Sequence, residues 1–313
     1  MPHVNWIEEP VLRRPVLILA MAGWNDASSV ATTAVRFLIE RWEAKKFAEI
    51  DPEEFFNFTR VRPQVRLDEN QARIIVWPET AFHCYQNPLL DRDFVLLIGI
   101  EPNFKWRTFG EAILQVCKEV GITSVISLGG LGAQVPHTRP AVVTGSTPDP
   151  DLASQFPELE IRRSRYEGPT GIVGVLTDMF NKAGIPTGSL WGNVPHYISA
   201  SPNPKVAHGI LTRLNSMYGL GLGLDDLARS GRRFERQVNE ALSQNPDVAE
   251  YVKQLEAAQD DGANEPATPE HEDLEDEPSG SEGLPDAQDV VRHLEEFLRR
   301  GRSGPSEGND PDN

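Results

Sequence analysis

Two glycine-rich blocks, each leading to a His-containing turn, constrain the fold of this chain more than any other feature. The first covers Ser124–Pro140 and opens with an apolar run, and the second starts at Tyr166 and continues through a helical pattern to Tyr197. Short apolar runs next to glycine are typical of buried strands, and glycine lets other groups approach the backbone closely. Because ligands of open α/β sheets bind at the carboxyl ends of the strands, the two blocks mark where a site is expected.

Apolar runs alternate with helical patterns along residues 1–224. The continuous runs at Pro15–Met21 and Asp93–Ile100 predict strands that are covered on both faces. Further strands are predicted at Glu54–Phe58, Arg73–Trp77, Ser124–Leu128 and Thr187–Trp191. Helices are predicted after Asp26 and at Thr108–Val120, Gly171–Ala183 and Asn203–Tyr218. Strands that alternate with helices imply crossover connections, so we expect one α/β domain, residues 1–224, with a largely parallel sheet.

The pattern changes after residue 224. Residues 225–259 carry two apolar stripes at helical spacing, separated at Pro246, and predict a helical hairpin. Residues 260–313 are acidic and rich in Pro, Gly and Ser, which is typical of a disordered tail. Within the tail, residues 286–300 have a cap, an apolar stripe and a following glycine, and predict a short helix. We expect that truncation after Gln259 leaves the melting temperature nearly unchanged.

The charge of the chain is concentrated in this tail. Residues 260–313 hold 17 acidic and 4 basic residues of a chain with a net charge of −17, so residues 1–259 carry only −4. A nucleic-acid-binding domain needs clustered Lys and Arg, which argues against nucleic acid as a partner. The two cysteines, Cys84 and Cys117, form no metal-binding spacing and suit a reducing compartment. Without a signal core or an apolar run of about twenty residues, we expect a cytoplasmic protein with no membrane contact.

Three carboxylates stand at predicted strand ends or helix starts, namely Asp26, Glu101 and Glu167. Since the carboxyl ends of parallel strands converge, the three can meet in one crevice. There they can bind a metal ion or a pair of ribose hydroxyls, or they can cap helices. Capping is the stronger interpretation for Asp26, whereas propensity does not explain Glu101 at the end of an apolar strand. We expect no metal and no cofactor.

Glycines and histidines supply the remaining candidates. Gly129 and Gly130 are interpreted as a tight turn, because no nucleotide-binding glycine motif is matched. If they line a functional crevice, Gly130→Val should abolish binding with less effect on stability. His137 and His196 both follow Val-Pro and can act as general bases or can simply hydrogen-bond to the backbone. Neither a GxSxG motif nor a nucleophilic cysteine context occurs, so enzymatic activity stays open.

Motifs in a fixed order resemble the actinobacterial branch of the proteasome assembly chaperone 2 family, over roughly residues 10–258. They are Gly23–Asp26, Gly99–Pro102 with Trp106 and Phe109, Leu128–Pro140, Tyr166–Ile172 with Gly174, and Trp191–Tyr197 with Pro202–Pro204. The resemblance implies a three-layer α/β/α sandwich of the phosphorylase/hydrolase-like type. It also implies homo-oligomers and, for eukaryotic and archaeal relatives, assembly or capping of the 20S proteasome.

One departure from the family concerns the C-terminus. Proteasome-binding relatives often end in a hydrophobic residue, Tyr and any residue, whereas this chain ends in Asn309–Asn313. A partner, such as a proteasome subunit, is therefore expected to contact the body, the 226–258 hairpin or a 286–300 helix that forms on binding.

The leading hypothesis is a non-enzymatic, oligomeric assembly or chaperone-type protein linked to the proteasome or to protein turnover. The alternative is an enzyme or small-molecule-binding protein with a nucleoside-phosphorylase-like crevice at the strand ends, and a regulatory scaffold acting through the tail is a third class. The predicted crevice residues are Trp24, Asn25, Asp26, Glu101, Gly129, Gly130, His137, Glu167, Gly168, Thr170 and His196.

Overall fold

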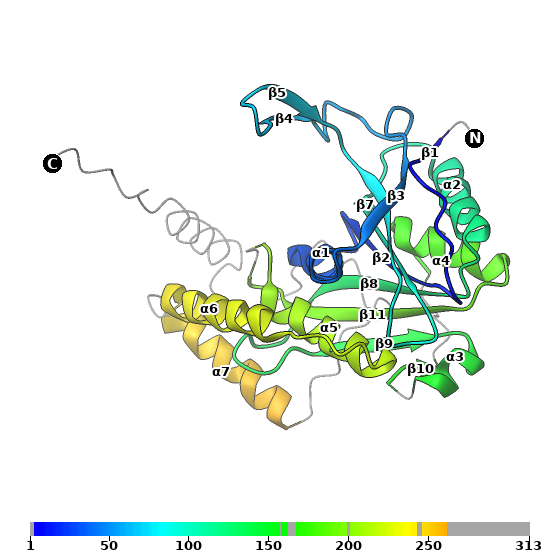
Figure 1. Ribbon diagram of the computed structural model, residues 1–313. Helices are drawn as coiled ribbons and strands as arrows, with labels where there is room; N and C mark the ends of the chain where they lie inside the picture. Colours follow the sequence, from blue (N-terminus) through cyan, green and yellow to red (C-terminus); the bar gives the residue numbers. More distant parts are fainter. Residues whose placement is uncertain (1–2, 157, 162–166, 199–200, 243–245, 262–313) are drawn as a thin grey trace, which may run out of the picture.

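A nine-stranded sheet forms the centre of the molecule (Figure 1). The computed structural model describes residues 3–156, 158–161, 167–198, 201–242 and 246–261. The strand order within them is β1-β3-β6-β7-β2-β8-β11-β9-β10. The strands are β1 (Val4–Trp6), β2 (Val16–Ala22), β3 (Lys45–Ile50), β6 (Thr80–Tyr85), β7 (Phe94–Ile100), β8 (Ser124–Ala133), β9 (Val143–Thr147), β10 (Glu160–Ile161) and β11 (Thr187–Pro195).

The four central strands, β7, β2, β8 and β11, run parallel to one another. Antiparallel strands flank them, with β6, β3 and β1 on one side and β9 on the other. Parallel strands need crossover connections. Helix α2 (Trp106–Glu119) supplies one between β7 and β8, and α4 (Ile172–Lys182) leads into β11. The predicted α/β class with a largely parallel sheet is confirmed, and its parallel part is the centre.

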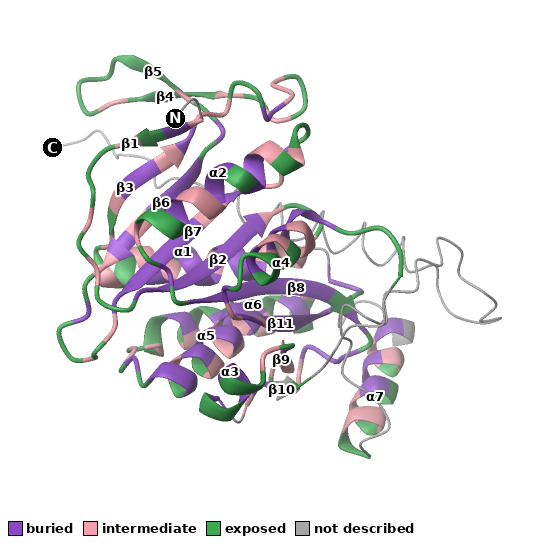
Figure 2. Ribbon diagram, turned by 90° about the vertical axis from the view of Figure 1, so that its right-hand side faces the viewer, coloured by how far each residue is buried: buried purple, intermediate pink, exposed green. Residues whose placement is uncertain are grey.

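Helices cover both faces of the sheet, which makes the predicted three-layer sandwich. Successive side chains of a strand point to opposite faces. In β2, Leu17 and Leu19 pack with α2 and α4, whereas Val16 and Ile18 pack with α1 (Val30–Trp42) and α5 (Pro204–Tyr218). Figure 2 shows the central strands buried between these helices. The short helices η1 (Ala27–Ser29) and α3 (Pro150–Gln155) complete this part of the chain.

The segment between β3 and β6 differs from the prediction. Residues 54–58 form turns rather than a strand, and Phe55 and Phe56 are buried there. Their apolar pattern reflects packing of a loop on α2, since the rings of Phe55 and Phe109 meet edge to face at 5.2 Å. The strand predicted at 73–77 exists as β5 (Arg73–Val76). It pairs with β4 (Gln64–Leu67) in a separate two-stranded sheet.

Two helices follow the sandwich, α6 (Asp225–Leu242) and α7 (Pro246–Asp260). Their inner faces form a small core with Tyr197 and Ile198, which follow β11. The predicted helical hairpin is therefore present, and its inner face packs on the body. The division of the chain at residues 224 and 259 remains a prediction, and the predicted helix at 286–300 lies outside the described residues.

Candidate functional site

The carboxyl ends of β2, β7 and β8 bring four of the predicted site residues together. The Gly23–Asp26 turn continues beside β8, where the Gly130 amide donates to the Asn25 carbonyl at 2.9 Å. Glu101 follows β7, and its Oε2 accepts from the Ile172 amide at 2.8 Å. The strand-end edge thus joins Asn25, Asp26, Glu101 and Gly130, as the parallel arrangement predicts.

Asp26 is fully engaged as a helix cap. Its Oδ1 accepts from the amides of Ala31 and Thr32 at 2.7 and 3.3 Å, and its Oδ2 accepts from the Thr32 hydroxyl at 2.5 Å. The side chain is buried, and this burial raises the pKa of Asp26 against the opposing effect of these hydrogen bonds. The carboxylate therefore holds the first turn of α1, and both of its oxygens are hydrogen-bonded within the protein, in agreement with the capping interpretation.

Glu101 also caps a helix, and two glycines, Gly23 and Gly171, lie close to it and to Asn25. Its carboxylate receives the first-turn amide of α4, a position that favours negative charge because of the helix dipole. A Cβ on Gly23 would lie 2.9 Å from the Glu101 Cβ, and one on Gly171 would lie 2.0 Å from Asn25 Oδ1. Gly23, which also has a φ of +134°, requires glycine, whereas a Cβ at Gly171 would force the Asn25 side chain to move.

The rim of this edge is apolar and exposed. Trp24 is 41% exposed and Phe104 is 50% exposed. Glu167, Gly168 and Thr170, which lead into α4, are exposed as well. Phe104 is not among the predicted crevice residues, although it lies between Glu101 and the motif residue Trp106. Of the polar groups, the buried Asn25 Oδ1 has no hydrogen-bond partner within the described residues.

The glycines at 129 and 130 do not form the expected turn. Strand β8 runs on to Ala133, so both lie inside it. A Cβ on Gly129 would lie 2.4 Å from the Trp191 ring, and one on Gly130 would lie 2.4 Å from Val30 Cγ2 and 3.0 Å from the Ala27 carbonyl. The turn interpretation is therefore wrong. These glycines let α1 and an aromatic ring approach the strand, so we expect a side chain at Gly130 to reduce stability directly.

His137 lies in a second group, beneath the helical hairpin. Its backbone amide donates to the Tyr197 hydroxyl at 2.8 Å, and the same hydroxyl lies 2.8 Å from Nδ1, to which it donates when Nε2 carries the ring proton. Asn239 Oδ1 of α6, 3.0 Å from Nε2, can only accept a hydrogen bond, which assigns the proton of the neutral ring to Nε2. Burial lowers the pKa of His137, so the ring is neutral at pH 7. Both ring nitrogens are occupied, which suits a structural link more than a general base.

His196 belongs to the same group and is also held by the protein. Its amide and its Nδ1 both lie 3.1 Å from the Ala133 carbonyl, and its Nε2 lies 3.3 Å from the Tyr251 hydroxyl of α7. The rings of Tyr197 and Tyr251 meet the imidazole nearly edge-on. This geometry agrees with the backbone-bonding interpretation. Asn239 and Tyr251 were missed because their helical patterns gave no sign of what they face.

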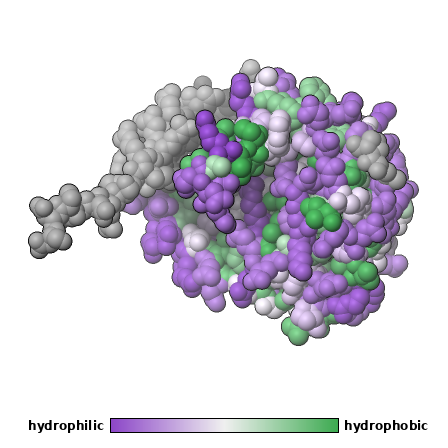
Figure 3. All heavy atoms as spheres, turned by 45° about the horizontal axis from the view of Figure 1, so that its top comes forward, coloured by the Kyte–Doolittle hydropathy of each residue, from purple (hydrophilic) through white to green (hydrophobic). Residues whose placement is uncertain are grey.

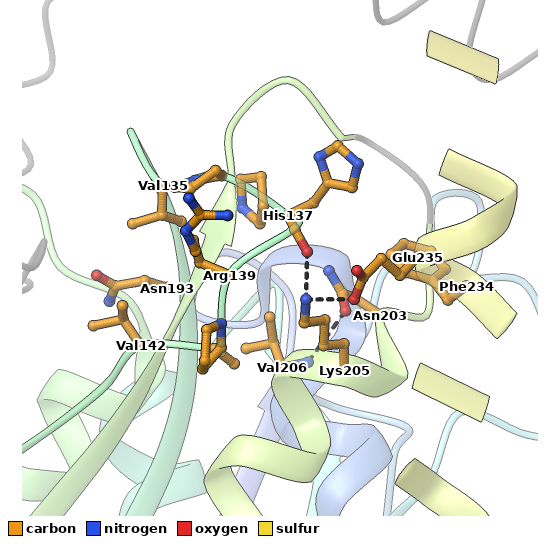
Figure 4. A pocket seen from close by; sticks show the side chains of 14 residues that line it. Val135, His137, Arg139, Val142, Asn193, Asn203, Lys205, Val206, Phe234 and Glu235 are labelled. Atoms are coloured by element: carbon orange, nitrogen blue, oxygen red, sulfur yellow. Dashed lines mark hydrogen bonds and ion pairs between the residues drawn. The ribbon is translucent and has the colours of Figure 1, made fainter. Parts of the chain in front are cut away.

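A pocket lies between the loop that follows β8 and helix α6 (Figure 4). The Lys205 ammonium crosses it and donates to the His137 carbonyl at 2.5 Å and to Glu235 at 2.6 Å. The remaining cavity is about 20 Å³, which holds one water molecule rather than a drug-sized ligand. Figure 4 shows the His137 carbonyl facing Lys205 while its ring points away.

The structure groups the candidates into two sets rather than one crevice. The described residues contain no cluster of three or more His, Cys, Asp or Glu side chains that could hold a metal ion. Asp26 and Glu101 cap different helices, and Glu167 is exposed, so the three carboxylates do not form a ligand trio. Among the described helices, none is long and apolar enough to span a membrane.

Comparison with known proteins identifies relatives over most of the chain. The sequence model of the PAC2 family matches residues 20–242. A PAC2 family protein from Streptomyces avermitilis is 40% identical, with a TM-score of 0.69, and the match covers 76% of this chain and 99% of that one. A proteasome-assembly chaperone homologue from Mycobacterium tuberculosis is 38% identical, with a TM-score of 0.67 and the same coverage.

More distant likeness concerns the fold alone. An archaeal proteasome activator from Pyrococcus furiosus is 21% identical, with a TM-score of 0.62 over 76% of this chain and 97% of that one. No curated protein matches the chain.

Proposed function

The chain belongs to the PAC2 family, and from this premise we propose that it is a non-enzymatic, chaperone-type protein that assists the assembly of the proteasome. The observation that carries the proposal is its likeness to the mycobacterial proteasome-assembly chaperone homologue, which is 38% identical and matched over 99% of its length. The proposal includes action in the cytoplasm and association of several copies of the chain.

The chemistry of the two residue groups supports a role without catalysis. Asp26 and Glu101 stabilise helix termini, and His137 is buried with both nitrogens bonded. A general acid or base must reach the substrate with a free proton or lone pair. The cavity beside His137 has room for about one water molecule. We therefore regard these side chains as parts of a binding scaffold, and we do not favour the phosphorylase-like alternative.

We propose that the outer face of α6 contacts an acidic surface of the partner. Four exposed arginines, Arg229, Arg232, Arg233 and Arg236, follow one another at i, i+3, i+4 and i+7. This spacing places them on one side of the helix, opposite the buried Leu227, Phe234 and Val238. Charge complementarity of this kind raises association rates and selects partners. The predicted 286–300 helix is proposed as a second, apolar contact.

Reconstitution of the proteasome tests the proposal. Purified α- and β-subunits from the source organism are mixed with and without the full chain, and 20S particles are measured by native electrophoresis and peptide hydrolysis. We expect faster or more complete assembly with the chain. Arg232→Glu with Arg233→Glu should weaken this effect. Arg107→Glu with Lys118→Glu, the same charge change on the exposed face of α2, should not.

A second double variant tests the proposed contact through the tail. Leu294→Asp with Phe297→Asp removes the predicted apolar stripe without touching the body. Proteins that co-purify from native cells are identified by mass spectrometry, and loss of proteasome subunits is expected. An unchanged set of proteins would restrict the contact to the body. The absence of any effect of the wild-type chain on assembly would refute the assembly role itself.

A further inference from the structure

Three arginines on the outer face of α6 have no carboxylate partner within the residues that the structure describes. Arg232, Arg233 and Arg236 are exposed and lie on two consecutive turns. Arg229 pairs with Asp226 and completes the set of four, which we call the arginine face. Guanidinium groups that lie side by side repel one another, so an anionic group beside them would be stabilised.

The other charges of this region do not compensate these arginines. Glu235, at the side of α6, already accepts from the Lys205 ammonium at 2.6 Å. Asp225 and Glu240 lie in the first and last turns of the helix. Helix α5, which packs against α6 at Gly231, contains no acidic residue. The middle of the arginine face is therefore a local positive charge on a chain with a net charge of −17.

An acidic segment of the same chain follows α7 closely. This segment, residues 270–277, has six carboxylates in eight positions and neither Lys nor Arg. Blocks of like charge often act as interaction tails. Eight residues, 262–269, connect the acidic segment to Asp261 after α7. The acidic segment is thus tethered to the body by a short linker.

The tether begins beside the middle of α6. Arg139 binds Asp260 at the end of α7 at 2.6 Å. Two residues earlier in the same loop, the His137 carbonyl accepts from Lys205 at 2.5 Å, and Lys205 also binds Glu235 of α6. A flexible linker of about nine residues has a root-mean-square span of about 16 Å, which is enough to reach neighbouring turns of α6. Such a tether gives a local concentration of roughly millimolar.

We propose that the acidic segment lies against the arginine face and competes there with the acidic surface of the assembly partner. Both carry negative charge and need the same arginines, so the partner must displace the tail. The tail would therefore exclude weak partners and yield to one that brings further contacts. The inference rests on the proposed function for the role of the arginine face, and it adds the regulation of that surface.

Such a contact agrees with the small effect on stability that we expect of the tail. Exposed ion pairs contribute little to the free energy of unfolding, and salt screens them. The tether nevertheless keeps a weak contact populated, because the local concentration is high. The contact should therefore depend on ionic strength.

The β4–β5 hairpin is another exposed surface on which two arginines lie close together. Arg66 and Arg73 are near its turn, beside the acidic Asp68 and Glu69. Figure 3, which brings the top of Figure 1 forward, shows hydrophobic residues beside hydrophilic ones in this region. Figures 1 and 2 both show the hairpin on the side of the molecule opposite α7. Its acidic turn and its distance from α7 favour the arginine face as the contact, and the hairpin supplies a matched control.

The distance between the acidic segment and α6 in the full chain tests the proposal. Spin labels are attached at Gln237→Cys, an exposed position of α6, and at Ser279→Cys, just after the acidic segment. Pulsed electron paramagnetic resonance then measures the distribution of distances between them. Cys84 and Cys117 are buried and should not react. We expect a dominant short-distance population at low salt and its loss near 1 M salt, where the screening length is about 3 Å.

Charge reversal locates the contact. Arg232→Glu with Arg233→Glu should remove the short-distance population. Arg66→Glu with Arg73→Glu makes the same charge change on the hairpin and should preserve it, and circular dichroism checks that both variants stay folded. A broad distribution in the wild type at low salt would overturn the contact. A short-distance population that survives reversal on α6, or that only reversal on the hairpin removes, would overturn its assignment to the arginine face.

Neutralisation of the tail repeats the test without any change to the body. Glu272→Gln, Asp273→Asn, Glu275→Gln and Asp276→Asn together should also abolish the short-distance population. In the reconstitution of 20S particles, the neutralised chain should act at an at least about twofold lower concentration than the wild type, because its arginine face is free. An equal concentration would overturn the competition. A wild-type chain without effect on assembly would refute the proposed function, whereas the distances would still decide whether the tail contacts α6.

Discussion

Close approach to the backbone is the common role of the site glycines. Gly23 and Gly171 leave room for Glu101 and Asn25, and Gly130 leaves room for the start of α1. Because the neighbours of Gly130 include a backbone carbonyl and a stiff valine, they cannot move aside cheaply. The motif that resembles a ligand-binding loop therefore stabilises the junction of strand and helix.

Replacement of Gly130 by alanine should destabilise the protein by about 1–3 kcal/mol, the usual cost of overpacking. The new Cβ would lie 2.4 Å from Val30 Cγ2 and 3.0 Å from the Ala27 carbonyl. Urea denaturation measures the change. Gly132→Ala is the control in the same strand, because its nearest neighbour would lie 3.9 Å away, and it should change stability by less than about 1 kcal/mol. Equal stability of the two variants would contradict the packing argument.

At the scale of elements, the Tyr197 hydroxyl is one of several groups that link the helical hairpin to the sandwich, beside the apolar core that the hairpin forms with Tyr197 and Ile198. The Tyr197 hydroxyl holds the His137 amide and imidazole, and that imidazole bonds Asn239 of α6. An ion pair between Arg139 and Asp260 holds the end of α7 nearby. The second of these contacts is at the surface and contributes little, whereas the first is buried.

Tyr197→Phe should lower the free energy of unfolding by about 1–3 kcal/mol, because it leaves the buried His137 amide without an acceptor. The amide hydrogens of α6 should exchange faster in this variant, because the His137 imidazole loses the hydroxyl that orients it. Tyr251→Phe removes a weaker contact of 3.3 Å to His196 and should change stability by less than about 0.5 kcal/mol. If α6 exchanges at the wild-type rate in Tyr197→Phe, the link does not hold the helix.

The whole molecule should lose stability in mild acid. Burial lowers the pKa of His83, His137 and His208. Below pH 6.5 the unfolded chain takes up protons that the folded chain does not, so the free energy of unfolding falls with pH until the folded values are reached. The charges that face His137, from Lys205, Glu235 and Glu256, shift its pKa less than burial does.

Urea midpoints at pH 8, 7, 6 and 5.5 measure this loss. We expect no change from pH 8 to 7 and a decline below pH 6.5. His137→Gln should have a shallower decline, by up to about 1.4 kcal/mol per pH unit, because one proton is no longer taken up on unfolding. A slope equal to that of the wild type would show that His137 does not titrate differently in the two states.

The acidic tail should contribute little to the stability of the whole molecule. A chain that ends at Asp261 keeps α7 and its ion pair with Arg139, and it loses residues with a composition that cannot bury much apolar surface. Its melting temperature should stay within a few degrees of that of the full chain. A much larger drop in calorimetry would mean that the tail packs on the body.

The sequence by itself determined the layers of this protein. The continuous apolar runs of β2 and β7 required cover on both faces, and their alternation with helices required crossovers. It also identified Asp26 as a cap, since Asp26 precedes a helix and its carboxylate receives that helix's first amides, whereas the Glu101 cap of α4 was not predicted. These properties depend on neighbours along the chain, so a local pattern records them.

Only the tertiary structure decided which segments meet. The apolar residues at 54–58 have the pattern of a strand, but they form a loop that packs on α2. The hairpin at 64–76 forms a separate two-stranded sheet and does not join the main one. Gly129 and Gly130 lie inside a strand, at positions where Trp191 and Val30, distant in sequence, come too close for a Cβ. His137 and Asn239 lie 102 residues apart. The sequence pattern indicates how apolar each segment is. It does not indicate which surface covers the segment, because that surface is formed by contacts between distant parts of the chain.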